Sequence, residues 1–154
     1  RTESKHMPGV ARALEFVKQR SGLPVWIVGT SRGTVSATAM AINVHDPAIA
    51  GLVLTSSVVR YATPGAVPRQ DLKAITMPVL VYHHAKDACK HCQVSEAPYI
   101  IKGLSNAPMK KLMVVDGGAN PTGDECAGQH WHGFPNFERE AISQIAQWIK
   151  NPVN

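Results

Sequence analysis

The chain has 154 residues, of which 44% are hydrophobic, 18% are charged and 6% are aromatic. This composition is typical of a compact folded domain and excludes disordered, collagen-like and low-complexity chains. The 16 Lys and Arg outnumber the 11 Asp and Glu and give a net charge of +5, but the basic residues are scattered, and only Lys110 and Lys111 are adjacent. Because nucleic-acid binding requires a basic stripe interleaved with aromatic side chains, we expect no nucleic-acid partner.

No apolar stretch is long enough to predict a membrane span. The longest, residues 35–44, is interrupted by Ser36, Thr38 and Asn43 and falls short of the roughly 18–20 residues that cross a bilayer. Arg1 stands where an initiator Met is expected, and no charged leader precedes an apolar run. We therefore expect no membrane partner and a chain that starts at a cut end.

The first element that the apolar pattern predicts is an amphipathic helix. Pro8 suits its first turn, Gly22 ends it, and the apolar residues at helical spacing are Val10, Leu14 and Val17. Four short apolar runs follow without polar alternation, as expected of parallel strands covered by helices on both faces. These runs comprise residues 25–28, 51–54, 78–82 and 112–115.

Helix-compatible stretches lie between and after these strands, at residues 34–43, 95–104 and 137–149. Strands that alternate with helices predict an α/β fold, a parallel sheet flanked by helices and joined by right-handed crossovers. No repeat or linker divides the chain, so we expect residues 1–154 to form a single domain. The connection from residue 55 to residue 77 has no clear helix, and such loops are often functional or mobile.

The strongest chemical signal is Gly29-Thr30-Ser31-Arg32-Gly33, which stands directly after the first predicted strand and before an Ala-rich helix. In this context Gly-x-Ser-x-Gly forms a sharp turn that exposes the serine hydroxyl. Gly29 and Gly33 are expected to let the backbones of strand and helix approach, and the helix start directs N–H groups at the same point. The alternative is a tight turn with an incidental serine.

Residues 24–37 resemble the nucleophile elbow of esterases and related serine hydrolases with the α/β-hydrolase fold. The Asp-x-Cys segment at Asp87 and the His-Gly-Phe segment at His132 resemble those of small exported bacterial members of this family. That fold normally starts with several strands before the elbow. The resemblance therefore implies a partial domain, the C-terminal half of the fold, with the N-terminal strands missing from this chain.

The resemblance also implies the chain order serine, acid, histidine. Asp87 follows the third strand at its carboxyl end and is our candidate acid, with Asp116 after the fourth strand as the alternative. His132 is our candidate base because it matches the family pattern, with His130 as the alternative. Gly133 is expected to give the histidine loop its freedom.

Three cysteines, Cys89, Cys92 and Cys126, lie close in sequence to these candidates. If Asp87 and His132 meet, their loops are neighbours, and the resemblance likewise indicates a Cys89–Cys126 disulfide that leaves Cys92 unpaired or bonded elsewhere. A disulfide indicates an oxidising compartment. We therefore expect a periplasmic or secreted location, with a cytoplasmic location as the alternative.

Redox and metal sites are weaker interpretations of the cysteines and histidines. The Cys89–Cys92 pair has C-x-x-C spacing, but a redox motif of this kind belongs between an early strand and its helix, not after a third strand. A zinc site has enough ligands, yet the chain lacks a second pair at ligand spacing. We expect no metal and no cofactor. The histidines considered as ligands are His83, His84, His91, His130 and His132.

Together these residues predict a serine hydrolase that cleaves carboxylic esters, or related acyl bonds, through a triad of Ser31, His132 and Asp87 and an acyl-enzyme. Without a large lid the site should be open and favour small soluble esters. The Arg32 N–H would support the oxyanion, but the family's second donor follows an earlier strand, and nothing before Pro8 supplies it. We therefore expect a missing N-terminal segment or a self-association partner. The alternative function is a catalytically incomplete module that binds a small molecule or a partner.

Overall fold

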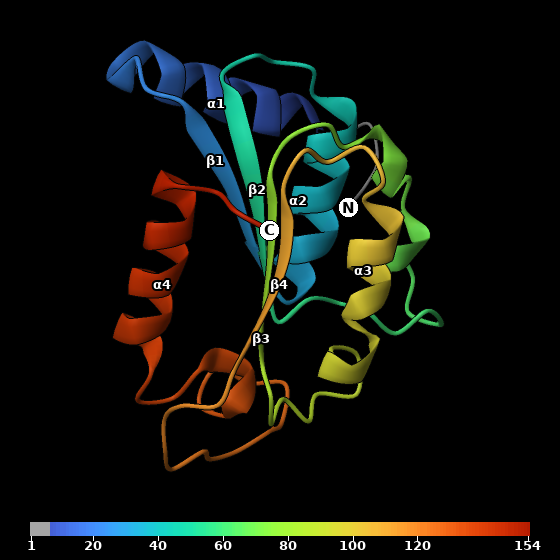
Figure 1. Ribbon diagram of the computed structural model, residues 1–154, viewed down its shortest axis with the longest axis vertical. Helices are drawn as coiled ribbons and strands as arrows, with labels where there is room; N and C mark the ends of the chain where they lie inside the picture. Colours follow the sequence, from blue (N-terminus) through green and yellow to red (C-terminus); the bar gives the residue numbers. More distant parts are fainter. Residues whose placement is uncertain (1–6) are drawn as a thin grey trace.

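The computed structural model describes residues 7–154. Four parallel strands form one sheet in the order β1-β2-β3-β4, with helices on both faces (Figure 1). The strands are β1 (Val25–Thr30), β2 (Ile49–Thr55), β3 (Val79–His84) and β4 (Lys110–Val115), and the helices are α1 (Met7–Ser21), α2 (Arg32–Asn43), α3 (Pro98–Gly103) and α4 (Glu138–Lys150). The α/β class predicted from the alternating elements is confirmed. Within the described residues no helix is both long and apolar enough to cross a bilayer.

The strands extend beyond the apolar runs that predict them: β1, β2 and β3 continue with polar residues at their carboxyl ends, and β2 and β4 begin two residues earlier, at Ile49 and Lys110. Thr30 of β1 pairs with Thr55 of β2, and β3 runs on to His84. The helix predicted over residues 95–104 is shorter than expected. Residues Val94–Glu96 form a single 3-10 turn, η3, and α3 begins at Pro98, whose missing N–H suits a first helical turn.

Two hydrophobic cores lie on opposite faces of the sheet. On one face α1, α2 and α3 pack over strand residues such as Leu52, Leu54 and Val81, all fully buried. On the other face α4 packs over Val53 and Leu80. In Figure 1 α4 stands on one side of the sheet, and α2 and α3 stand on the other. Because β2 and β3 are covered on both faces, their central residues form continuous apolar runs.

Two tryptophan rings, one of which packs over Gly51, hold α4 against its face of the sheet. The Trp26 ring lies over Gly51 in the neighbouring strand, where a Cβ would overlap the ring. Trp148 of α4 meets Trp26 edge-on, with ring centroids 5.8 Å apart and planes at 82°. Such pairs contribute about 0.5–1.5 kcal/mol beyond the area they bury. Gly51 thus makes room for the contact between β1 and α4.

The connection after β2 is packed against the rest of the fold. Val58 and Ile75 are at most 3% exposed, and the two 3-10 turns η1 (Val67–Arg69) and η2 (Leu72–Ala74) each begin with a buried residue. The sequence predicts no helix here, and the structure adds only these single turns. The buried residues of this segment therefore extend the hydrophobic core past the carboxyl end of β2.

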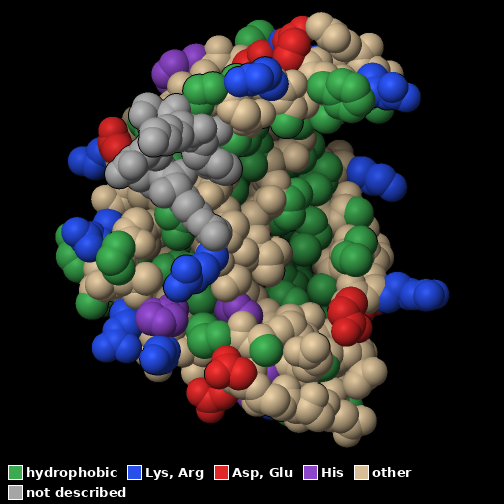
Figure 2. Space-filling model, turned by 180° about the vertical axis from the view of Figure 1, so that it is seen from behind, with side chains coloured by type: hydrophobic (Ala, Val, Ile, Leu, Met, Phe, Trp, Pro, Cys, Tyr) green, Lys and Arg blue, Asp and Glu red, His purple; other side chains and the backbone are tan. Residues whose placement is uncertain are grey.

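The outer edge of β1 pairs with no other strand in the part of the chain that the structure describes. Val28 of β1 is 58% exposed, and Leu23, just before the strand, is 67% exposed. Seen from behind, the molecule has hydrophobic side chains gathered in a hollow (Figure 2). An open strand edge is a surface to which another strand can add.

Candidate active site

The loops that carry the candidate residues meet at one end of the sheet. Ser31 follows β1, Asp87 follows β3, and His132 lies in the connection after β4. Because all four strands are parallel, the loops at their carboxyl ends share one side of the molecule, the lower end in Figure 1. The topology thus gathers residues from three separate parts of the chain.

Ser31 occupies a strained turn between β1 and α2. Its backbone has φ 51° and ψ −122°, a conformation that costs a non-glycine residue on the order of 1–3 kcal/mol. The Ser31 N–H donates to the Thr55 carbonyl oxygen at 3.0 Å, and the Thr34 N–H and hydroxyl donate to the Ser31 carbonyl oxygen at 2.9 and 2.6 Å. These bonds hold the turn that presents Ser31 to the pocket described below.

The two glycines of the motif differ in the space around them. A Cβ on Gly29 would lie 2.7 Å from the Ala37 Cβ and 2.7 Å from the Gly33 carbonyl oxygen, so β1 and α2 approach closely only because Gly29 has no side chain. A Cβ on Gly33 would meet no atom within 4 Å. The expectation of close approach therefore holds for Gly29 and is wrong for Gly33, which faces open space.

A buried hydrogen bond joins His132 to Asp87. His132 Nδ1 lies 2.9 Å from Asp87 Oδ2, and the two side chains are 4% and 0% exposed. The Cys89 N–H donates to the other carboxylate oxygen at 3.0 Å. Because the carboxylate can only accept, the proton is assigned to Nδ1, and Nε2 keeps its lone pair. Nε2 is buried and has no hydrogen-bond partner within residues 7–154.

The alternative acid and base are placed differently. The Asp116 side chain is 59% exposed and pairs with Lys86 at 2.7 Å, and the hydrogen bond from Lys86 lowers the pKa of Asp116. His130 stands at the start of the turn that contains His132, and its Nδ1 atom is buried without a partner among the described residues. The structure thus pairs Asp87 with His132, and neither Asp116 nor His130 takes part in this hydrogen bond.

The turn around His132 is fixed from two sides. It is the single 3-10 turn η4 (Trp131–Gly133), and the Ser56 hydroxyl, just after β2, donates to the His132 carbonyl oxygen at 2.7 Å. A Cβ on Gly133 would overlap the Gly128 carbonyl oxygen. The expectation that Gly133 gives the loop freedom is therefore wrong, because this glycine permits close packing. Ser56 has no sequence signal beyond its position at a strand end.

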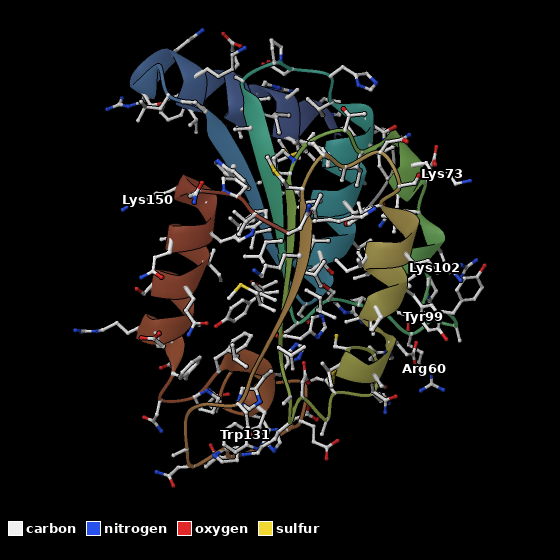
Figure 3. All side chains as sticks on the ribbon, viewed as in Figure 1. Arg60, Lys73, Tyr99, Lys102, Trp131 and Lys150 are labelled. Atoms are coloured by element: carbon white, nitrogen blue, oxygen red, sulfur yellow. A yellow bond between two sulfur atoms is a disulfide. The ribbon has the colours of Figure 1, made fainter. Side chains whose placement is uncertain are left out.

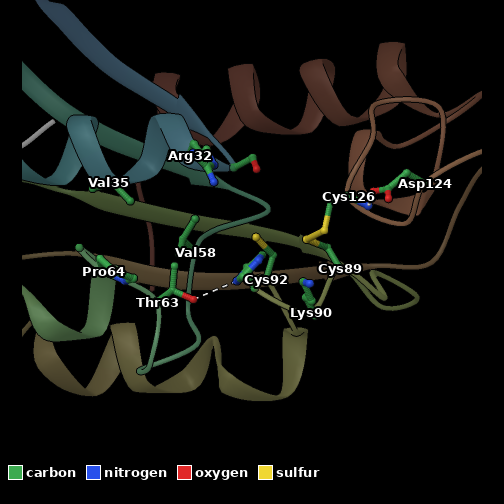
Figure 4. A pocket seen from close by; sticks show the side chains of 13 residues that line it. Arg32, Val35, Val58, Thr63, Pro64, Cys89, Lys90, Cys92, Asp124 and Cys126 are labelled. Atoms are coloured by element: carbon green, nitrogen blue, oxygen red, sulfur yellow. Dashed lines mark hydrogen bonds between the residues drawn. A yellow bond between two sulfur atoms is a disulfide. The ribbon is translucent and has the colours of Figure 1, made fainter.

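Cys89 and Cys126 form a disulfide that joins the Asp87 loop to the His132 loop (Figure 4). This pairing agrees with the expectation from the family resemblance. The two cysteines are 37 residues apart in sequence, and closing a loop of that length contributes about 4 kcal/mol in the chain-entropy account. The bond therefore supports the juxtaposition of the two loops.

Cys92, the remaining cysteine, is buried beside the same groups. Its sulfur lies within 4.8 Å of a ring nitrogen of His132. Burial raises the pKa of Cys92 to about 12, the charge of Asp87 adds to this shift, and a hydrogen bond with the Ser31 side chain opposes it. At neutral pH Cys92 is thus a neutral thiol close to His132, in the wall of the cavity that Ser31 also lines.

Two buried histidines end β3 and lead into the Asp87 loop. The Ser57 N–H donates to His83 Nε2 at 3.0 Å. Burial lowers the pKa of His83 to about 4, although the charge of Asp87 acts in the opposite direction. His84 stacks on Trp131, with ring centroids 4.7 Å apart, and Figure 3 shows Trp131 at the lower end of the molecule. These contacts connect the end of β3 to η4.

A cavity of about 820 Å³ opens at Ser31 (Figure 4). This volume is within the range of small-molecule sites. Across one wall, Thr63 Oγ1 and His91 Nδ1 form a hydrogen bond of 3.0 Å between the segments that follow β2 and β3. The lining residues are Ser31, Arg32, Val35, Val58, Thr63, Pro64, Gly65, Cys89, Lys90, His91, Cys92, Asp124 and Cys126.

Arg32 is the first residue of α2 and follows Ser31 directly. The N–H groups of a first helical turn have no acceptor within the helix, and the helix dipole favours negative charge at this end. The Arg32 N–H therefore lies next to Ser31 at the positive end of the α2 dipole.

Comparisons with known proteins bear on the fold. No model of a known protein family and no curated protein sequence matches the chain. Among solved structures, the chain is similar to the esterase domain of a protein from Rhodothermus marinus, with 12% sequence identity and a TM-score of 0.61. The alignment covers 92% of this chain and 67% of that one. At this identity the likeness shows a shared α/β fold.

Gly29→Ala should lower the free energy of unfolding by about 1–3 kcal/mol, because the added Cβ would collide with Ala37 and the Gly33 carbonyl group. The matched variant Gly33→Ala should keep full stability or gain up to about 1 kcal/mol from better helix propensity. Urea denaturation followed by circular dichroism measures both variants. Equal losses in the two proteins would contradict this account of the turn.

His83 should make stability depend on pH. Its pKa is about 4 in the folded chain and 6.5 ordinarily, so between these values the unfolded chain binds more protons. Stability should therefore be complete above the ordinary pKa and fall by roughly 3 kcal/mol as the pH drops to the folded pKa. His83→Gln keeps an acceptor for Ser57 and should flatten this slope in urea unfolding between about pH 4 and pH 7. An unchanged slope would rule out His83 as its source.

Proposed function

We propose that this protein is a serine hydrolase that cleaves carboxylic esters, or related acyl bonds, through an acyl-enzyme. The observation that carries the proposal is the buried His132–Asp87 hydrogen bond, which leaves His132 Nε2 without a partner in the described chain. The Cys92 sulfur lies within 4.8 Å of a ring nitrogen of His132, and Cys92 and Ser31 line the same cavity, which supports a site shared by the hydroxyl and the imidazole. The fold shared with an esterase domain is consistent with this function.

In the proposed reaction, Ser31 Oγ attacks the carbonyl carbon while His132 Nε2 takes the hydroxyl proton. Asp87 is buried and accepts the hydrogen bond from Nδ1, so its charge stabilises the imidazolium that forms. The proton then passes to the leaving alcohol as the ester C–O bond breaks. A water molecule attacks the acyl-enzyme in the same way and releases the acid. Ser31 Oγ and His132 Nε2 form no hydrogen bond in this structure, and in apo enzymes such a contact is often long and tightens only when substrate binds.

The proposed oxyanion site takes one donor from the Arg32 N–H. Loss of one such donor typically costs about 10²- to 10³-fold in turnover, so an efficient site needs a second. We propose that this donor comes with a strand that adds to the open edge of β1, either from a further segment of the same protein or from a second copy of the chain. The exposure of Val28 on β1 supports this proposal.

Small soluble esters are the substrates we propose. The cavity of about 820 Å³ offers apolar contacts from Val35 and Val58 close to Ser31, which suit short acyl or alcohol groups. The Cys89–Cys126 disulfide supports a further proposal, that the protein works in an oxidising compartment such as the periplasm or the extracellular space.

A fluorophosphonate probe should form a covalent adduct with Ser31, detected as one added mass on the intact chain. Ser31→Ala should abolish the adduct. Asp87→Asn should slow labelling by about 10²- to 10⁴-fold, because the His132 tautomer is then no longer fixed.

The alternative residues provide matched controls for this labelling experiment. The probe should label Asp116→Asn and His130→Gln at nearly the rate of the unmodified chain. It should label His132→Gln much more slowly, because that variant lacks the proposed base. No adduct on a folded chain supplied with its strand partner would overturn the hydrolase proposal and favour a binding module. Equal losses in Asp116→Asn and Asp87→Asn would overturn the assignment of the acid.

The open β1 edge should make the isolated chain self-associate. Size-exclusion chromatography with light scattering should give a mass above that of one chain, and Val28→Lys should shift it toward the monomer because a charged edge resists pairing. β4 is the other edge strand of the described sheet, so Val114→Lys, at a similarly exposed position, tests whether pairing occurs there instead and should leave the mass unchanged. A monomeric chain with full esterase activity would contradict the need for a partner strand.

A further inference from the structure

Three potential metal ligands gather where the Asp87 and His132 loops meet, and a fourth potential ligand, also a cysteine, is bonded to one of them. The sulfur atoms of Cys89 and Cys92 and one ring nitrogen of His132 all lie within 4.8 Å of one another, and the three residues are at most 3% exposed. Cys126 brings a third sulfur, since it is bonded to Cys89. A tetrahedral zinc ion with Zn–S bonds of about 2.3 Å places neighbouring ligand atoms roughly 3.5–4 Å apart. The spacing of the first three ligand atoms is therefore close to that around one zinc ion, and Cys126 can supply a fourth ligand once its bond to Cys89 is reduced.

The state of the His132 ring points independently to a ligand. Nε2 is buried with no hydrogen-bond partner among the described residues, while Nδ1 is held by Asp87 at 2.9 Å. In metal sites a ligating histidine usually donates its other ring N–H to a carboxylate, which fixes the ring and raises its basicity. Asp87 and His132 already have this arrangement.

The disulfide decides whether the sulfur atoms can bind a metal. While Cys89 and Cys126 are bonded to each other, neither can become a thiolate, and the thiolate is the ligand. A dithiol reductant would transfer two electrons and two protons to the bond, giving two cysteine thiols and its own cyclic disulfide. Binding of the metal would then release the protons of three thiols.

We propose that reduction of the Cys89–Cys126 disulfide opens a zinc site formed by Cys89, Cys92, Cys126 and His132. The bound ion occupies His132 Nε2, the atom assigned above as the general base. Zinc therefore inhibits the hydrolase activity of the reduced protein, and removal of zinc by a chelator or reoxidation of the disulfide restores this activity. The inhibition rests on the proposed hydrolase function, whereas the zinc site itself does not.

Zinc binding tests the site directly. The chain is reduced with a trialkylphosphine, which takes oxygen from water to become the phosphine oxide and leaves no competing thiol. Titration against a chromophoric chelator should then show one zinc per reduced chain, with at least about 100-fold weaker binding to the oxidised chain, since three of the ligands are thiolates. Co²⁺ in place of zinc should give thiolate-to-cobalt charge-transfer absorption.

Variants identify the ligands in the reduced chain. Cys92→Ala and His132→Ala should each weaken zinc binding by at least about 10- to 100-fold, and Asp87→Asn should weaken it by a similar factor through the His132 ring. His130→Ala, on the same loop, is the matched control and should bind zinc like the unmodified chain. Equal zinc affinity in the oxidised and reduced chains, or in Cys92→Ala and the unmodified chain, would overturn the proposal.

Two further measurements separate folding and function from the site. If reduction unfolds the chain, zinc should restore the native circular dichroism, and failure to do so would overturn the zinc site. Ser31→Ala should bind zinc with unchanged affinity when reduced. If the reduced chain binds zinc but the oxidised chain shows no labelling of Ser31, only the hydrolase proposal is overturned. If Ser31 is labelled but the reduced chain binds no zinc, only the zinc-site proposal is overturned. In the unmodified reduced chain, zinc should slow labelling at least 10-fold, and a chelator should reverse the effect.

Discussion

The buried carboxylate of Asp87 constrains the whole carboxyl end of the sheet. Its side chain is fully shielded from solvent and receives one hydrogen bond from His132 and another from the Cys89 N–H. A buried carboxylate without hydrogen-bond partners costs several kcal/mol, so burial of Asp87 requires the loops after β3 and β4 to meet. The disulfide to Cys126 and the hydrogen bond from Ser56 then hold them in that position.

Ser31 brings a second constraint, because its backbone conformation is unfavourable and must be supported by its surroundings. The support comes from Thr34 and Thr55, which bind its carbonyl and N–H groups, and from Gly29, which lets α2 lie close to β1. Thr34 also accepts a hydrogen bond from the Val58 N–H and so connects the turn to the pocket wall. Strain held by such a network is typical of functional sites.

The free Nε2 atom of His132 gives one structure two proposed chemistries. With the disulfide intact, its lone pair serves as a base toward Ser31. With the disulfide reduced, the same lone pair completes a set of soft ligands. Asp87 supports both roles, because a carboxylate on Nδ1 orients the ring and strengthens its other nitrogen toward a proton or a metal ion. The oxidation state of Cys89 is the variable that selects between them.

Most of the fold was predictable from the sequence, because strands and helices follow from the periodicity of neighbouring residues. The apolar runs locate all four strands, and Gly29 to Gly33 marks the turn at Ser31 from local chemistry alone. The site was predictable only as a short set of candidates. No local pattern separates Asp87 from Asp116, since the choice depends on which side chain the fold buries.

The tertiary structure also decided what no motif indicates. It assigned close packing to Gly133 and open space to Gly33, although both are glycines in motifs, because the distance to a neighbouring backbone depends on how loops far apart in sequence pack. For the same reason it placed Cys92 near His132 and in the wall of the cavity that Ser31 also lines. The sequence by itself determined the elements and their order, through interactions between near neighbours. The meeting of the site loops at the carboxyl ends of the strands was decided by long-range packing around a buried charge.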